Sequence, residues 1–215
     1  MDDPNVDEAT LKAALAEVTR VNKYLGGQQV ILEGLRYFFD RFPQKSYTIL
    51  DVGCGDGAML RSIANFARKR SIAVKLIGID INPKSISLAE ERSQDFPEVS
   101  FHVQDVFKLK NTQKEIDIIT STLTTHHFTA AEILKFLAQF LKLANLGVVI
   151  NDLQRSTIAY RLFQAYSRVF VRSAMARHDG LISIERAFTK NELLSFTSKL
   201  GVQSFSIKWR WAFRS

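Results

Sequence analysis

The hydrophobic and polar residues of this chain alternate with two periods, one typical of amphipathic helices and one typical of buried strands. Apolar residues recur every three or four positions over residues 7–25 and 30–39, which predicts two helices with one buried face each. Short, mainly apolar runs follow, and they predict strands of a buried parallel sheet. These runs cover residues 49–52, 75–79, 99–103, 116–120 and 147–150.

Helical patterns separate the predicted strands. One pattern begins at Ala58, and two others cover residues 83–94 and 129–143. Asn82 can cap the second of these helices, because Pro83 suits the first helical position. Strands that alternate with helices predict an α/β fold, here a Rossmann-like doubly wound, mostly parallel sheet preceded by N-terminal helices.

The chain beyond the fifth strand carries an insertion and a short tail. Residues 156–175 predict a long helix or a helix pair, which we interpret as a helical lid. Thr189 and Glu192 form a capping-box pattern for a helix over residues 191–200. Alternating apolar positions over residues 202–213 predict a further strand, so we expect six or seven strands. About a dozen residues follow this helix, so the last strand is either very short or missing, and a missing strand would leave an edge that permits an oligomer.

Length and composition fit one ordinary domain over residues 1–215. We divide it into an N-terminal helical cap (1–43), a cofactor-binding core (47–152), a lid (153–187) and a C-terminal helix and strand (188–215). The polar, acidic N-terminus is unlike a signal peptide, and no apolar run of about eighteen residues is present. The single cysteine cannot form an internal disulfide, so we expect a cytoplasmic protein.

The first strand ends at Asp51 and opens into three alternating glycines, Gly53, Gly55 and Gly57. Glycines let the backbone turn tightly and approach a ligand closely. Because a helix starts directly after them, the loop suits a nucleotide-like cofactor. The same stretch also fits the dinucleotide fingerprint Gly-x-Gly-x-x-Ala, so the loop alone leaves a dehydrogenase open.

Acidic residues also end the second and third strands. Asp80 is placed to accept hydrogen bonds from two ribose hydroxyls, and Asp105 follows the third strand. Ligands of open parallel sheets bind at this rim of strand ends. A dehydrogenase fits less well, because 215 residues leave no room for a substrate domain and none of the five tyrosines has Lys four positions on.

The pattern acid-x-Gly-x-Gly-x-Gly resembles motif I of the class I S-adenosylmethionine-dependent methyltransferases, and Asp80 and Asp105 fit the same family. Over residues 20–200 the chain is similar to small-molecule members, including those of bacterial quinone and polyketide pathways. The resemblance implies S-adenosylmethionine as cofactor, with the Asp105 side chain and the Val106 amide on the adenine, and no metal site. The cofactor-binding positions that we expect are Asp51, Gly53, Cys54, Gly55, Gly57, Asp80, Ile81, Asp105, Val106 and Thr122.

The loop after the fourth strand contains two adjacent histidines, His126 and His127. If the acceptor is a hydroxyl, either histidine can serve as general base, and His178 is a third candidate. The loop lacks the Asn/Asp-Pro-Pro-aromatic turn found in amino methyltransferases of adenine and cytosine. We therefore expect methylation of a small molecule, most simply on a phenolic, quinone or polyketide-like hydroxyl.

The net charge of +7 is unevenly distributed, since residues 153–177 contain five arginines and no acid. One hypothesis is a basic amphipathic helix at an anionic membrane surface, with arginines on one face and apolar residues on another. These are Arg161, Arg168 and Arg172, and Ile158, Leu162, Tyr166 and Phe170. An RNA methyltransferase and a cofactor-binding protein without turnover remain alternatives, although we do not expect a nucleic-acid partner.

Overall fold

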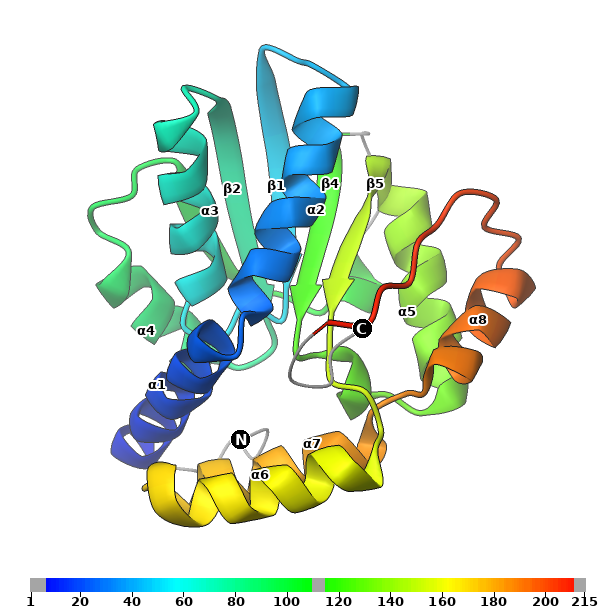
Figure 1. Ribbon diagram of the computed structural model, residues 1–215. Coiled ribbons are helices and arrows are strands. Elements are labelled where there is room, and N and C mark those ends of the chain that lie inside the picture. The colour runs from blue at the N-terminus through cyan, green and yellow to red at the C-terminus, as the bar shows by residue number, and fades with distance from the viewer. Residues whose placement is uncertain (1–6, 110–114, 211–215) are drawn as a thin grey trace. The chain divides into compact units, whose positions relative to one another are not determined.

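The computed structural model describes residues 7–109 and 115–210 (Figure 1). The chain divides into two compact units, a sheet unit and a helical unit. The sheet unit contains residues 28–122 and 135–150. The helical unit contains residues 1–27, 123–134 and 151–215. No described helix combines the length and the apolar composition needed to cross a lipid bilayer.

The sheet runs in the order β3-β2-β1-β4-β5, and its arrows point the same way in Figure 1. The strands are β1 (Ser46–Val52), β2 (Ala73–Asp80), β3 (Val99–Val103), β4 (Ile116–Thr122) and β5 (Ala144–Asn151). Asp51 is in register with Gly78, and Asp80 is in register with Val103. The parallel, doubly wound fold is therefore confirmed, and the chain order reverses at β1, where ligand sites of such sheets form.

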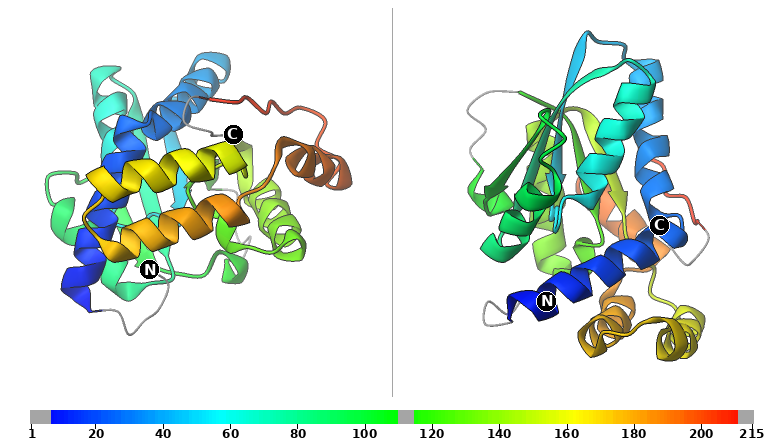
Figure 2. Two further views of the ribbon diagram at one scale, coloured as in Figure 1. Left: turned by 60° about the horizontal axis from the view of Figure 1, so that its bottom comes forward. Right: turned by 90° about the vertical axis from the view of Figure 1, so that its left-hand side faces the viewer.

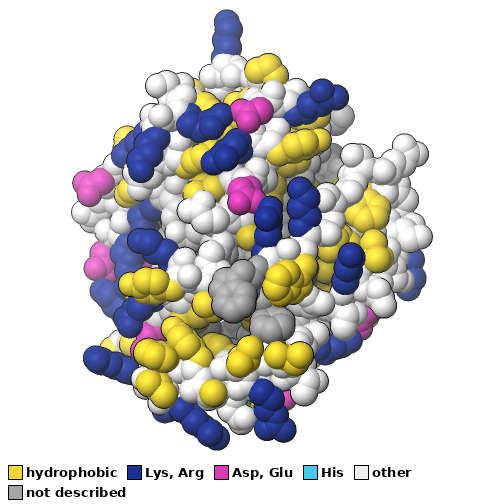
Figure 3. Space-filling model, viewed as in Figure 1, with side chains coloured by type: hydrophobic (Ala, Val, Ile, Leu, Met, Phe, Trp, Pro, Cys, Tyr) yellow, Lys and Arg dark blue, Asp and Glu magenta, His cyan; other side chains and the backbone are white. Residues whose placement is uncertain are grey.

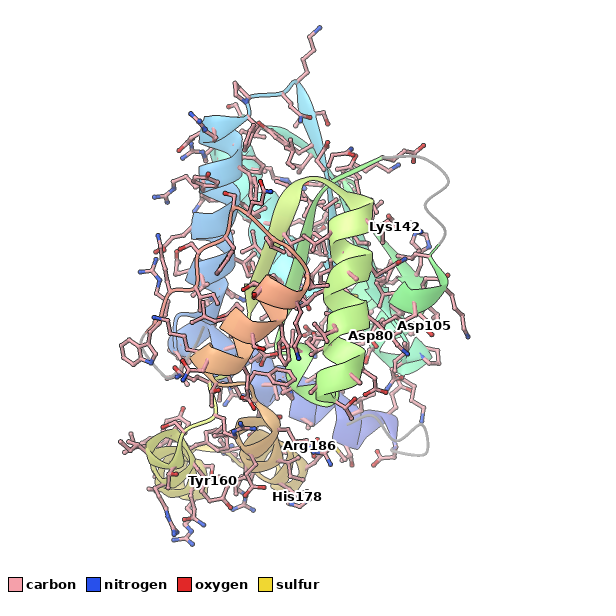
Figure 4. All side chains as sticks on the ribbon, turned by 90° about the vertical axis from the view of Figure 1, so that its right-hand side faces the viewer. Asp80, Asp105, Lys142, Tyr160, His178 and Arg186 are labelled. Atoms are coloured by element: carbon pink, nitrogen blue, oxygen red, sulfur yellow. The ribbon has the colours of Figure 1, made fainter. Side chains whose placement is uncertain are left out.

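Helices cover both faces of this sheet. They are α2 (Gly27–Arg41), α3 (Ala58–Lys69), α4 (Pro83–Arg92) and α5 (Ala130–Leu143). In Figures 1 and 4, α2 lies on one face of the sheet and α5 on the other. The side chain of Tyr47 and those of Ile49 and Leu60 are among the largest that the core buries completely. The helix expected after Asn82 is present, and the Asn82 side chain accepts from the Lys84 amide at 2.9 Å.

The helical unit contains α1 (Glu8–Tyr24), the short 3₁₀ turn η2 (Thr125–His127), α6 (Thr157–Phe170), α7 (Ala174–Arg186) and α8 (Lys190–Lys199). Figure 2 shows α6 and α7 side by side, so the predicted insertion is a helix pair. The capping box of Thr189 and Glu192 at the start of α8 is confirmed. Glu17 of α1 accepts hydrogen bonds from the amides of Arg172 and Ser173, at 2.9 and 2.8 Å, and so holds the turn between α6 and α7.

Two sequence-based expectations are wrong. Residues 202–210 form no strand, and the rest of the predicted segment lies outside the described residues, so the described sheet has five strands rather than six or seven. Phe205 and Trp209 are about half exposed there, and only Arg210 of these residues lies in a β-bridge, so the alternation alone does not make a strand. On α6, Ile158 and Leu162 lie exposed beside the arginines rather than on a separate face, and Arg172 follows the end of the helix.

Candidate functional site

The glycine loop after β1 has a backbone that only glycine adopts readily. Gly53, Gly55 and Gly57 have φ angles of 73°, 53° and 74°. The amides of Gly53 and Cys54 both donate to the carbonyl of Ile79 in β2, at 2.9 and 3.1 Å. A Cβ at Gly57 would also lie 2.6 Å from the ring of Phe101. The loop is therefore fixed to β2, with no side chain between its backbone and the end of the sheet at these positions.

Asp80 connects this loop to the end of β2. Its Oδ2 accepts from the Gly55 amide at 3.0 Å, and its Oδ1 accepts from the Asn82 amide at 2.9 Å. A carboxylate oxygen can accept more than one hydrogen bond, so a carboxylate that accepts from backbone amides can also accept from ribose hydroxyls. The amide of Gln104 donates to the Asp80 carbonyl at 2.9 Å, which brings the end of β3 to the end of β2. Asp105 follows directly, and Figure 4 shows both acids at this end of the sheet unit.

Asp51 is the buried acid of the site. Its side chain accepts from the Thr120 hydroxyl at 2.7 Å and is 2% exposed. Burial raises the pKa of Asp51 to about 7; the Thr120 hydrogen bond lowers it, and the negative charge of Asp80 raises it further. A positive ligand would favour the ionised form of this carboxyl. S-adenosylmethionine carries both an ammonium and a sulfonium group, so the donor set and the charge of this site fit it.

The remaining expected cofactor positions differ in their accessibility. Cys54 is buried, and burial together with Asp51 raises the pKa of its thiol well above the usual range, which argues against a nucleophilic role. Ile81 is 68% exposed, whereas Val106 is buried behind Asp105, whose carboxylate accepts from the Phe107 amide at 2.9 Å. The Thr122 hydroxyl is buried at the end of β4. Contact between these positions and the cofactor stays a prediction.

The helical unit contains a partly open cavity of about 400 Å³. Most of its lining is apolar and includes Val18, Val21, Leu25, Leu123, Leu153, Ala159, Leu162, Phe163, Tyr166, Val171 and Ile184. Its polar lining includes Glu17, Asn22, His126, His127 and Asp179. Leu123 has a φ of 55°, a strained conformation for a leucine, at the point where the chain enters the histidine loop. A mainly apolar cavity with a few polar groups is the usual form of a small-molecule site.

His126 is held by Asp152, the residue that follows β5. Asp152 Oδ1 lies 2.7 Å from His126 Nδ1, and both side chains are buried. Asp152 also accepts from the amides of Thr125 and Leu153, at 2.6 and 2.7 Å, and from the Thr125 hydroxyl. Burial alone would raise the pKa of Asp152, but the electrostatic interaction with His126 and these hydrogen bonds lower it to about 2. The carboxylate is thus ionised and fixes Nδ1, which leaves Nε2 of His126 for proton transfer.

The other two candidate histidines lie in different settings. The His127 ring is 4.4 Å from the His126 ring, and it lines the cavity while its residue is exposed. His178 is exposed on α7, and it is not among the described residues that line the cavity (Figure 4). The geometry therefore favours His126 among the three. The described residues contain no group of three or more His, Cys, Asp and Glu side chains placed to hold a metal ion.

Three polar residues of the helical unit were not found from the sequence. Asp152 follows the fifth strand, so the rule applied to Asp51 and Asp80 could have identified it. Asn22 falls on the predicted apolar face of the first helix, where a polar residue is itself a signal. Its buried amide oxygen has no hydrogen-bond partner among the described residues. Glu17 carried no such signal, because its partners lie 155 and 156 residues away.

Comparison with known proteins gives a consistent result. The model of a family described as methyltransferase domain matches residues 43–189. The malonyl-acyl-carrier-protein O-methyltransferase 1 of Ilyobacter polytropus is 37% identical over 81 residues, which are 38% of this chain and 28% of that protein. The chain spans about a quarter of the length of the curated relatives that it matches.

Solved structures of similar fold are also methyltransferases. The plantazolicin methyltransferase BpumL, in complex with a pentazolic substrate analogue and SAH, has a TM-score of 0.67 at 20% identity, covering 87% of this chain and 69% of its own. The magnesium protoporphyrin IX methyltransferase of Synechocystis PCC 6803, with bound SAH, has a TM-score of 0.59 at 15% identity, covering 84% and 76%. At this identity the similarity establishes the fold alone.

Proposed function

This chain belongs to the methyltransferase domain family and its cofactor is S-adenosylmethionine, and from that premise we propose that it methylates a hydroxyl group of an apolar small molecule with His126 as general base. The observation that carries the proposal is the buried His126–Asp152 pair, which lines a mainly apolar cavity.

The residues of the sheet unit would hold the cofactor, which supplies an activated methyl group when it is bound. The Asp80 carboxylate accepts from the ribose hydroxyls while it keeps the glycine loop in place through Gly55. Asp105 accepts from the adenine amino group, and the buried Asp51 offers negative charge to a cationic group. The open backbone at Gly53, Gly55 and Gly57 permits the close approach.

His126 and Asp152 would manage the proton of the acceptor. Asp152 accepts the Nδ1 hydrogen and so fixes the tautomer that has a lone pair on Nε2. Nε2 would take the hydroxyl proton as the acceptor oxygen bonds to the methyl carbon, while the bond between that carbon and the cofactor sulfur breaks and its electron pair stays on the sulfur. The resulting imidazolium is stabilised by the ionised Asp152, because its low pKa keeps the carboxylate from taking the proton itself.

The cavity lining indicates the chemical class of the acceptor. Its volume of about 400 Å³ lies within the range of small-molecule sites, and apolar side chains dominate its wall. The buried amide oxygen of Asn22, which has no hydrogen-bond partner in the part of the chain that the structure describes, can accept from a hydroxyl or N–H of the acceptor. This bond would remove the free-energy cost of a buried acceptor without a donor. A phenolic, quinone or polyketide-like molecule meets both conditions. The acceptors named for the plantazolicin and magnesium protoporphyrin enzymes support a small-molecule substrate.

The competing functions have weaker support. The hypothesis of an RNA methyltransferase is supported by the net charge of +7. RNA recognition, however, needs exposed side chains that stack on bases and contact phosphates rather than a partly open apolar cavity. A cofactor-binding protein without turnover has no need of a base held by a buried carboxylate. Detection of any methylated product would eliminate this second alternative.

The test is a pair of neighbouring substitutions. With an acceptor identified by mass spectrometry from a panel of phenolic, quinone and polyketide compounds, His126→Ala should lower kcat by roughly a hundredfold or more. Cofactor affinity, measured by calorimetry, should stay within about twofold, because His126 acts on the acceptor. His127→Ala is the matched control and should lose much less, since His127 is exposed whereas the His126 side chain is buried against Asp152. A loss of only two- or threefold in both variants would mean that positioning alone accelerates the reaction.

A further inference from the structure

Helix α6 has an apolar stripe that faces solvent. Ile158, Leu162 and Val169 are 65%, 55% and 74% exposed. They are separated by four and seven residues and therefore lie on one side of the helix, with the exposed Ala165 between them. Single exposed apolar residues are ordinary, but a continuous stripe on one helix marks an interaction surface. We call these four residues the outer stripe.

The outer stripe borders the packed side of the same helix. Ala159, Phe163 and Tyr166 lie on this adjacent side and line the cavity, as Leu162 at the border does, and Ser167 is buried. The packing of the helical unit thus accounts for the inner residues of α6 and not for the exposed side chains of Ile158 and Val169. Figure 3 shows hydrophobic side chains at the lower edge of the view, where α6 lies in Figure 1, with Lys and Arg side chains next to them.

The charged residues of α6 and of the turn after it are all positive, and the acid Glu185 of α7 lines a shallow pocket together with Arg161. Arg161 and Arg168 lie at the edge of the stripe, three and ten residues after its first member, and Arg172 follows the end of the helix. All three are exposed, and no acid occurs between residues 153 and 177. Within the described part of the chain, the side chains of Arg168 and Arg172 have no ion-pair partner. Arg155 differs, because it pairs with Glu192 at 2.6 Å.

We propose that the outer stripe and its three arginines form a docking surface for an anionic lipid bilayer. An amphipathic helix of this kind lies in the plane of the interface, with apolar side chains among the acyl chains and cationic side chains among the headgroups. Guanidinium groups suit lipid phosphates, with which they form paired hydrogen bonds. No described helix spans a bilayer, so the attachment is peripheral.

Charge complementarity distinguishes the lipid surface from other partners. A second copy that packed through the same face would oppose arginines with arginines, because a two-fold interface pairs identical patches. A nucleic acid would attract the arginines but offers no apolar layer for Ile158 and Val169. An anionic bilayer provides both the negative headgroups and the apolar interior.

Docking would also bear on the acceptor, a consequence that rests on the proposed function. Leu162 belongs to the outer stripe and also lines the cavity. A bilayer in contact with α6 would therefore meet the wall of the cavity, and a lipid-dissolved acceptor could enter from it. The docking itself does not depend on this consequence and can be measured without any acceptor.

The experiment is co-sedimentation of the 215-residue chain with phosphatidylcholine vesicles that contain or lack phosphatidylserine. The wild-type protein should bind the anionic vesicles at low ionic strength, bind neutral ones at least tenfold less tightly, and dissociate as salt is raised. The variant Arg161→Gln/Arg168→Gln/Arg172→Gln should lose at least tenfold in apparent affinity. Removal of the same charge from the sheet unit, in Arg41→Gln/Lys135→Gln/Lys142→Gln, is the matched control and should change the affinity by less than twofold.

The apolar part of the surface needs its own variant. Ile158→Ser/Val169→Ser removes two exposed side chains that do not line the cavity and should weaken vesicle binding about tenfold with all arginines present. Equal binding by the arginine variant and its control, or no sedimentation at low salt, would overturn the proposal. So would a concentration-dependent dimer that Ile158→Ser/Val169→Ser abolishes in the absence of vesicles. Unchanged binding of S-adenosylhomocysteine in every variant would show that they fold and that the proposed function stands or falls separately.

Discussion

At the scale of single residues, two buried aspartates have pKa values that are shifted in opposite directions, because their hydrogen-bond donors and neighbouring charges differ. Asp51 has the Thr120 hydroxyl as its donor and the negative Asp80 nearby, so burial dominates and the pKa rises to about 7. Asp152 is equally buried, yet several amides, a hydroxyl and His126 stabilise its charge, and the pKa falls to about 2. The first acid is suited to a cationic ligand, and the second is suited to holding a histidine.

The raised pKa of Asp51 predicts that the affinity for S-adenosylmethionine depends on pH. Below about 7 the carboxyl is mostly protonated and offers no charge, so affinity should rise at least fivefold between about pH 5.5 and about pH 7.5. Calorimetry at the two pH values measures this directly. Asp51→Asn, which cannot ionise, should bind more weakly and remove the pH dependence.

The raised pKa of Asp51 also predicts how the stability of the unliganded protein depends on pH. The unfolded Asp51 releases its proton near 3.8 and the folded one near 7, so the folded state binds more protons in between. The free energy of unfolding should therefore fall as pH rises across this window, less so in Asp51→Asn. A wild-type affinity that is the same at both pH values would contradict the assignment of Asp51 to the cofactor.

At the scale of elements, glycines and caps decide how closely the helices and strands approach. A Cβ at Gly34 of α2 would lie 2.5 Å from Val149 of β5, and one at Gly147 would collide with Phe38, so α2 and β5 meet where a glycine of one faces a side chain of the other. In the helical unit, the contact between distant segments is instead polar. The carboxylate of Glu17 accepts two backbone amides at the turn between α6 and α7 and is 7% exposed.

Glu17 should therefore be important for the stability of the helical unit. Glu17→Ala would leave the partly buried amides of Arg172 and Ser173 without this acceptor, at a cost of about 2 kcal/mol. For a chain of this size, that corresponds to a fall in Tm of roughly 4–8 °C. Hydrogen exchange at the two amides should also accelerate.

Glu90→Ala on the exposed surface of α4 is the control for Glu17, and it should change the stability by less than about 0.5 kcal/mol. If both variants melt at the same temperature, the carboxylate of Glu17 is not what holds the turn.

At the scale of the whole molecule, the two units contain different parts of the proposed chemistry. The predicted cofactor positions from Asp51 to Thr122 all belong to the sheet unit, whereas the cavity, the candidate histidines and Asp152 belong to the helical unit. The chain passes from one unit to the other immediately after β4, between Thr122 and Leu123. A ligand of the sheet unit should thus stabilise the protein without any acceptor.

S-adenosylhomocysteine at about a hundred times its Kd should stabilise the folded chain by about 2.7 kcal/mol, or roughly 5–10 °C in Tm. Asp80→Ala removes the proposed ribose acceptor and should weaken binding about tenfold or more. The rise in Tm that the same ligand concentration causes should therefore be about halved or smaller. Asp95→Ala, an exposed acid of the same unit, is the control and should keep the full shift. A full shift in Asp80→Ala would remove the ribose assignment.

The sequence by itself determined the features that depend on residues close together in the chain. The alternation of strands and helices, the left-handed glycines and the capping box of Thr189 and Glu192 follow from local periodicity and from backbone preferences. The acids at the ends of β1, β2 and β3 could be assigned to one rim because parallel strands place their carboxyl ends together. Family and cofactor could be predicted from that local pattern.

Only the tertiary structure decided which segments meet. The alternation of residues 202–210 is typical of a strand, but a strand needs a partner that periodicity does not show. The apolar residues of α6 divide into an inner and an outer side because the neighbours of a helix, not its own sequence, determine which face is covered. The choice of His126 over His127 likewise depended on Asp152, 26 residues away, because a side chain on another element fixes the ring.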